Sequence, residues 1–168
     1  MIVNITKGSD PYGLCRYLLG KELGGKKPNS HYLGGNMSGQ DATELAEEFR
    51  FSHDLNRRVE KNMIHYSVSL PPGERVDNET MVKISEDLLF LMGHCDASSY
   101  ERLVKDKKRP EDVYRDEEAL TQFFIVQHLD RIEDTDCQHW HVAASRVRLD
   151  GTLTRDSFER YRVREAER

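Results

Sequence analysis

The chain has few cysteines and no long apolar run. Its 168 residues include three cysteines, Cys15, Cys95 and Cys137, an odd number at wide spacing that argues against a disulfide framework. No apolar stretch approaches the roughly 18 residues of a membrane span. The first residues, Met1 to Lys7, lack the layout of a signal peptide. We therefore expect a cytosolic protein without membrane insertion.

The chain also lacks an excess of basic residues. It has 25 Lys and Arg against 30 Asp and Glu, a net charge of −5. Because phosphate neutralisation by Lys and Arg supplies most non-specific affinity for nucleic acid, the average charge argues against broad binding of this kind. This argument applies to the average charge and not to a single face. Basic residues gather locally at Lys21, Lys26 and Lys27, at Arg57, Arg58 and Lys61, at Lys105 to Arg109, and at Arg146, Arg148 and Arg155.

The apolar pattern predicts a single α+β domain. A length of 168 residues is enough for one domain with a real core. Because the strands are mostly separated by helices that must pack on them, we expect a mostly antiparallel sheet flanked by helices. Alternation and helical periodicity predict strands at 1–7, 62–70, 122–128 and 138–144, helices at about 11–22, 41–58, 78–91, 111–120 and 154–164, and a long glycine-rich loop at 23–40.

Three of the seven histidines fall within fourteen residues: His128, His139 and His141. On a strand, His139 and His141 project from one face about 7 Å apart, and Trp140 points to the other face. If the two last strands pair as a hairpin, His128 falls beside His139, at about 5 Å. The three imidazoles could then hold one metal ion, so the pattern predicts metal-assisted chemistry.

Other residues near the histidines allow alternatives. Asp130 would lie at the rim, where it could orient the second ring nitrogen of a ligand. Cys137 could be a fourth ligand, although a free thiol is the more usual role. A lone H-x-H pair is often only a pair of solvated side chains. A cupin-type site would need a glutamate soon after H-x-H, where residues 145–147 are Ser, Arg and Val.

Several segments together resemble the relaxase, or mobilisation nuclease, family of histidine-hydrophobic-histidine endonucleases. They are Gly13–Leu19, Leu33–Met37, Val68–Pro72 and the H-x-D and H-x-H block that ends at Val147. The resemblance runs in order over nearly the whole chain and implies a sheet of about five antiparallel strands flanked by helices. Residues 1–168 would then be a nuclease domain, the N-terminal part of a longer protein, because the sequence stops inside a helical pattern.

The resemblance also implies an activity. Such nucleases nick one strand of single-stranded DNA at a plasmid origin of transfer, which starts conjugative mobilisation together with accessory mobilisation and coupling proteins. They form a 5′-phosphotyrosine link, leave a free 3′-hydroxyl and use a divalent cation. The implied site consists of Tyr17 as the nucleophile, Asp130 as the acid beside the first histidine, His128, His139 and His141 as metal ligands, and Ser69, Arg16 and Arg146 as DNA contacts.

Two residues compete with these assignments. Tyr12 lies one helical turn before Tyr17 and is the alternative nucleophile; from the residues alone, Tyr17 is an ordinary helix tyrosine packed on the sheet. His65 lies on the same strand face as Ser69 and is interpreted as a core histidine.

The expected chemistry is consistent with these residue types. A phenol with a pKa of about 10 is a poor nucleophile at neutral pH and needs a base or a cation to attack phosphorus. Three neutral imidazoles leave the cation its full charge, and they suit transition metals better than Mg²⁺. We therefore expect Mn²⁺ to work at least as well as Mg²⁺. The rival functions are a non-catalytic DNA-binding module and a metal-dependent phosphohydrolase.

Overall fold

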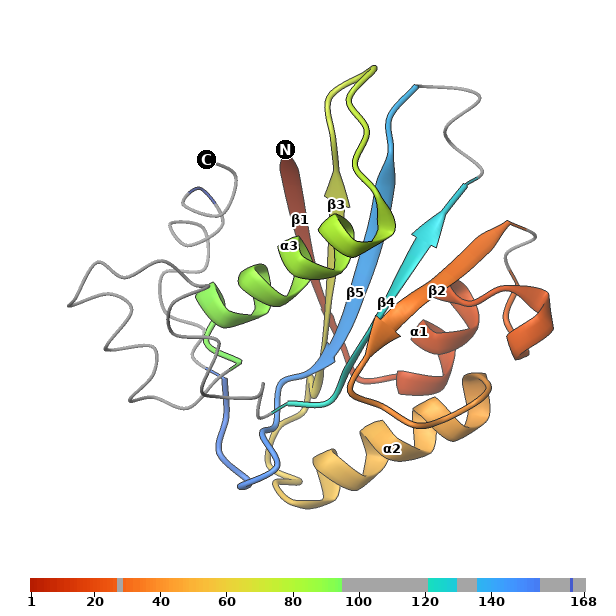
Figure 1. Cartoon of the computed structure of the whole chain (residues 1–168). Coiled ribbons are helices and arrows are strands. Elements are labelled where there is room, and N and C mark those ends of the chain that lie inside the picture. Colours follow the sequence, from red (N-terminus) through yellow and green to blue (C-terminus); the bar gives the residue numbers. More distant parts are fainter. Residues whose placement is uncertain (27–28, 95–120, 130–135, 155–163, 165–168) are drawn as a thin grey trace.

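Five strands form one antiparallel sheet in the order β1-β3-β5-β4-β2 in the computed structural model, with α3 on one face and α1 and α2 on the other (Figure 1). This confirms the expected α+β class. The structure describes residues 1–26, 29–94, 121–129, 136–154 and 164. Its elements are β1 (Ile2–Gly8), α1 (Pro11–Leu18), the 3₁₀ helix η1 (Lys21–Leu23), β2 (Ser30–Gly35), α2 (Ala42–Asp54), β3 (Met63–Ser69), α3 (Asn78–Leu91), β4 (Phe123–His128) and β5 (His139–Ser145).

Aspartate side chains cap the helices α1, α2 and α3. Asp10 accepts a hydrogen bond from the backbone N–H of Gly13, and Asp41 and Asp77 cap α2 and α3 in the same way. Such caps satisfy backbone donors that have no partner inside a helix, so these helices begin where the sequence predicts. α1 ends earlier than expected because Leu19 is extended. The helix predicted at 111–120 lies outside the described residues, and so does the helix predicted at 154–164 except for its two terminal residues, Thr154 and Arg164.

The interpretation of 23–40 as one long loop is wrong, since β2 lies within it. β2 pairs with β4 from Ser30, opposite His128, to Gly35, opposite Phe124. Its sequence lacks apolar alternation, so pairing with β4 rather than its own pattern defines it as a strand. Gly35 has a positive φ of 142°, and a Cβ there would overlap the carbonyl oxygen of Phe123. Glycine therefore lets this edge strand approach its neighbour.

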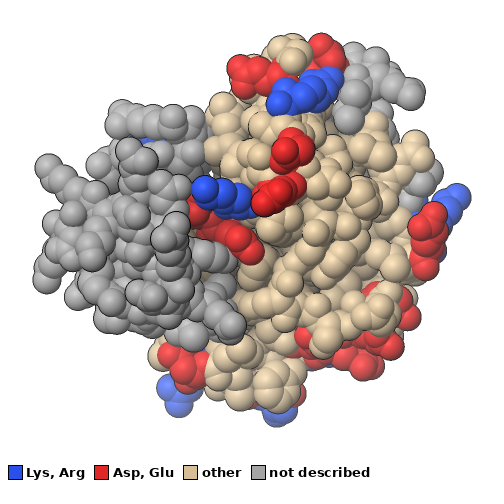
Figure 2. Space-filling view, in the orientation of Figure 1, with Lys and Arg blue, Asp and Glu red and all other residues tan. Residues whose placement is uncertain are grey.

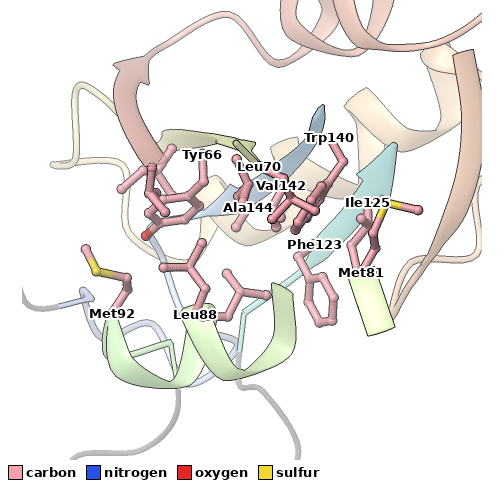
Figure 3. Close-up of a cluster of buried hydrophobic side chains, with 14 residues drawn as sticks. Tyr66, Leu70, Met81, Leu88, Met92, Phe123, Ile125, Trp140, Val142 and Ala144 are labelled. Carbon is pink, nitrogen blue, oxygen red and sulfur yellow. The ribbon is translucent and has the colours of Figure 1, made fainter. Parts of the chain in front are cut away.

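One face of the sheet packs against α3 in an apolar cluster (Figure 3). Trp140 is fully buried there, and its indole N–H donates to the hydroxyl of Ser85 on α3, 2.9 Å away. This confirms that Trp140 points away from His139 and His141. The core residues on this face include Tyr66, Leu70, Met81, Leu88, Phe123, Ile125, Val142 and Ala144.

The side chains on the opposite face of the sheet change from apolar to polar along the strands. Near α2 it is apolar, with Phe124 on β4 and Ala143 on β5 in the core. Because side chains alternate between faces, the next residues on this face are Val126 and then His128 on β4, and His141 and then His139 on β5. The same face is therefore a packed core at one end and a histidine cluster at the other. Among the described helices, none is long and apolar enough to cross a membrane.

Candidate metal centre

The pairing of β4 with β5 brings three histidines together. His128 lies directly opposite His139, which confirms the expected hairpin neighbours, and His141 follows on the same face of β5. The ring centroids are 5.7 Å apart for His128 and His139, 5.4 Å for His139 and His141, and 4.2 Å for His128 and His141. One ligand nitrogen from each ring lies within 4.8 Å of the others, and all three residues are buried.

Two of the three rings are held through one nitrogen. Nε2 of His128 lies 2.8 Å from the carbonyl oxygen of Leu18, and because a carbonyl only accepts, the ring donates from Nε2 and leaves Nδ1 for a cation. Nδ1 of His141 lies 2.8 Å from Nε2 of His65, so His141 can bind a cation through Nε2. A ligand histidine whose other nitrogen is held in this way is typical of protein metal sites.

His65 belongs to this cluster rather than to the apolar core. It lies on β3, half-buried, with its ring centroid 5.0 Å from that of His141. Burial, together with the nearby His128, lowers the pKa of His65 from 6.5 to about 4, so the ring is neutral at pH 7. The sequence interpretation missed this contact, although the period of two in β3 already placed His65 on the face of Ser69.

Tyr17 lies against the histidines, and Tyr12 contacts a different residue. The Tyr17 ring makes edge-to-face contacts with His128 and His65, at centroid distances of 6.3 and 6.4 Å, and is 50% exposed. The ring of Tyr12 is 5.6 Å from the guanidinium carbon of Arg16. Residues five apart on a helix point about 140° apart, which explains why these two tyrosines have different neighbours.

The other predicted site residues lie in different parts of the structure. Ser69 pairs with His139 across β3 and β5, so its side chain shares their face. Arg16 is half-buried beside Tyr12 on α1. Arg146 follows β5 at the end of the strand away from His139; it is 6% exposed, and Nη1 donates to the carbonyl oxygen of Lys61.

Two further predicted residues are not part of the ligand group. Asp130 lies outside the described residues, so its role stays a prediction. Cys137 is half-buried, and the ligand group found among the described residues consists of the three histidines without it. This favours the free thiol over the fourth ligand.

The segment that leads into His139 is fastened to the loop after β3. The side-chain amide of Gln138 accepts from the backbone N–H of Val76 at 2.9 Å and donates to the carbonyl of the same residue at 3.0 Å. Arg75 forms an ion pair with Asp136. Since these contacts come within three residues of His139, they fix the position at which β5 enters the cluster.

The donor set fits a transition metal. Three neutral imidazoles that converge on one point add no negative charge, so a bound cation would keep its full charge and open coordination positions. Three nitrogen ligands with no described carboxylate are less suited to Mg²⁺, which prefers oxygen. The residues present therefore fit Mn²⁺ or a similar ion.

Figure 2 shows the molecule in the orientation of Figure 1, from the side on which α3 covers the sheet. On this side the described Lys and Arg side chains lie singly and close to acidic ones rather than in a basic stripe (Figure 2).

The chain matches the model of a known protein family. A family model described as relaxase, MobA/VirD2-like, nuclease domain, matches residues 17–104 and 114–168, which is well over half of the chain. The matched ranges begin at Tyr17 and include His65 and the three clustered histidines. No curated protein and no solved structure matches the chain.

Proposed function

Because the chain belongs to the relaxase family, with a MobA/VirD2-like nuclease domain, we propose that it is a metal-dependent enzyme that nicks and rejoins one DNA strand. Its substrate is single-stranded DNA at a plasmid origin of transfer, and nicking there starts conjugative mobilisation. The observation that carries this proposal is the contact between Tyr17, which is half-exposed, and His128, one of three buried histidines with convergent ligand nitrogens.

The three histidines have the role of metal ligands in this proposal. A Mn²⁺ or Mg²⁺ ion bound by His128, His139 and His141 would supply Lewis-acid polarisation of the scissile phosphate and offset the charge that develops on it. The protein keeps the ligand rings in place through the Leu18 carbonyl and His65. Because all three rings are buried, water has limited access to the ring nitrogens that would hold the ion.

Tyr17 is the nucleophile. Its phenol loses a proton, the phenol oxygen forms a bond to phosphorus as the bond from phosphorus to the 3′-oxygen breaks, and the 3′-oxygen takes up a proton, so that no net proton is released. The products are a 5′-phosphotyrosine and a free 3′-hydroxyl. The covalent link conserves the phosphodiester, so the reverse attack by a 3′-hydroxyl can rejoin the strand. Half-exposure of Tyr17 is consistent with a polymeric substrate that reaches the ring from solvent.

Further residues have proposed roles around this reaction. Ser69, across the sheet from His139, contacts the DNA near the nick, and Arg16 contacts its phosphates. Arg146 does not fit the DNA-contact role expected for it, because it is buried beyond the other end of β5 and donates to the Lys61 carbonyl. Asp130 is the acid beside His128. Accessory mobilisation and coupling proteins are the expected protein partners.

A denaturing gel tests the proposal through the covalent product. The protein is incubated with Mn²⁺ and single-stranded oligonucleotides tiled across the DNA that flanks its own gene. We expect a protein–DNA adduct that disappears with chelator and in Tyr17→Phe. Tyr12→Phe is the matched control, because it removes the same hydroxyl from the same helix at a residue that contacts Arg16 instead of the histidines.

Three results would contradict the proposal. An adduct lost in Tyr12→Phe but kept in Tyr17→Phe would show that Tyr12 is the nucleophile. DNA and metal binding without any adduct would favour the DNA-binding module, and turnover of small phosphoesters without DNA would favour the phosphohydrolase.

A further inference from the structure

We propose that His65 is a positioning residue of the metal centre, which sets the orientation and the tautomer of His141. This inference rests on the proposed metal-binding role of His141. Its carrying observation is the contact of 2.8 Å between Nε2 of His65 and Nδ1 of His141, two residues that lie 76 positions apart in the sequence. The β3–β5 pairing brings them together, with His65 opposite Ala143, one step along the same face from His141.

The contact has a defined proton arrangement when His141 binds a cation. Only one hydrogen can lie between the two nitrogens. If Nε2 of His141 is the ligand atom, Nδ1 of His141 carries the hydrogen and donates it to Nε2 of His65. His65 thus has for His141 the role that the Leu18 carbonyl has for His128: it accepts from the nitrogen that does not bind the ion.

His65 acts through His141 rather than as a fourth ligand. Its Nε2 already faces Nδ1 of His141, and the ligand atoms that converge among the described residues come from the other three histidines. Carboxylates are common partners for ligand histidines, but a carboxylate would add a negative charge beside the ion. An imidazole holds His141 without that charge, so more of the cation's charge acts on the phosphate.

The same side chain also touches the proposed nucleophile. The ring of Tyr17 packs edge-to-face on His65, with centroids 6.4 Å apart and planes at 72°. His65 therefore lies between Tyr17 and His141 and contacts both. A change at this position should displace the nucleophile and the ligand together, which predicts a larger effect on kcat than on KM for DNA.

Metal binding by purified variants tests the inference. Mn²⁺ affinity is measured by calorimetry for the wild type, His65→Ala and His65→Gln. We expect His65→Ala to weaken binding by about 10- to 100-fold, and His65→Gln to recover most of it because an amide oxygen can accept from His141. His53→Ala is the matched control: His53 is a half-buried histidine on α2 whose Nε2 hydrogen-bonds to the Val59 carbonyl, and its loss should change affinity less than twofold.

A spectroscopic readout separates positioning from simple structural support. With Zn²⁺ as a diamagnetic probe, ¹⁵N shifts of the wild type should show Nδ1 of His141 protonated and Nε2 bound to metal. Metal bound to a nitrogen of His65, or hydrogen on Nε2 of His141, would overturn the inference even if a variant fails to fold. Unchanged affinity in His65→Ala would also overturn it, whereas a wild type that binds neither ion would remove the metal-binding function itself.

Discussion

The two faces of the sheet both contain buried histidines and use them in opposite ways. On the α3 side, His94 is 1% exposed, with Nε2 bonded to the Tyr66 hydroxyl and Nδ1 to the Thr121 hydroxyl, each at 2.8 Å. Both ring nitrogens are therefore occupied. On the other side, the ligand nitrogens of the three clustered histidines converge within 4.8 Å.

The difference shows that burial alone does not identify a functional histidine. His94 and His141 are both buried and both contact another polar side chain. In the cluster, by contrast, each of several rings directs one nitrogen at a common point. Burying polar nitrogens in this arrangement costs free energy unless a ligand binds them. We expect that substitutions on the two sides will separate function from stability.

The largest expected effect is on activity, from a substitution in the cluster. His139→Ala should abolish tight Mn²⁺ binding and slow nicking by about 10³-fold, because the cation's stabilisation of the transition state amounts to several kcal/mol. The free energy of unfolding of the metal-free protein should fall by about 1 kcal/mol or less. On one preparation, calorimetry measures Mn²⁺ affinity, adduct formation measures the rate of nicking, and urea unfolding measures stability. A variant that nicks at the wild-type rate would contradict the metal site.

The reverse pattern is expected for His94. His94→Leu leaves the hydroxyls of Tyr66 and Thr121 buried without this partner, so the free energy of unfolding should fall by about 3 kcal/mol. Mn²⁺ affinity of the folded variant should stay near the wild-type value. Urea unfolding measures this loss. The control is His53→Leu, which removes one half-buried hydrogen bond and should lower the free energy of unfolding by about 1 kcal/mol. Equal losses in the two variants would refute a special role for His94.

His94 should also make stability depend on pH. Burial, with Arg148 and Arg146 nearby, lowers the pKa of His94 from 6.5 to about 3. The unfolded chain therefore binds a proton below about pH 6.5 that the folded chain excludes, so stability is full above that pH and is lost as the pH falls toward 3. The slope from this group is at most about 1.4 kcal/mol per pH unit. Urea unfolding at pH 7, 6 and 5 should show a steeper loss in the wild type than in His94→Leu; parallel curves would contradict the shift.

The smallest effect is expected beside the cluster, at Cys137. Because the ligand group among the described residues consists of the three histidines, Cys137→Ser should change Mn²⁺ affinity by less than about twofold. Calorimetry checks this. A loss comparable to that of His139→Ala would make Cys137 a ligand.

Much of the fold was accessible from local patterns. The caps at Asp41 and Asp77, the alternation in β3 and the apolar runs of β4 and β5 are signals that each segment carries by itself, because propensity and periodicity act over a few residues. β2 was not accessible in this way. Its residues become a strand only through hydrogen bonds to β4, some ninety positions later in the chain.

The residues of the candidate site also differ in whether local sequence patterns or long-range packing bring them together. The sequence by itself determined that His139 and His141 share one face of a strand, because side chains alternate with a period of two. It predicted His128 beside them on the condition that consecutive strands pair as a hairpin, and the structure confirms this pairing. Only the tertiary structure decided that Tyr17 rather than Tyr12 contacts the histidines, and that His65 holds His141. These contacts depend on how α1 packs on the sheet and on β3 lying next to β5, and long-range packing of this kind leaves no periodic signal in the residues that it joins.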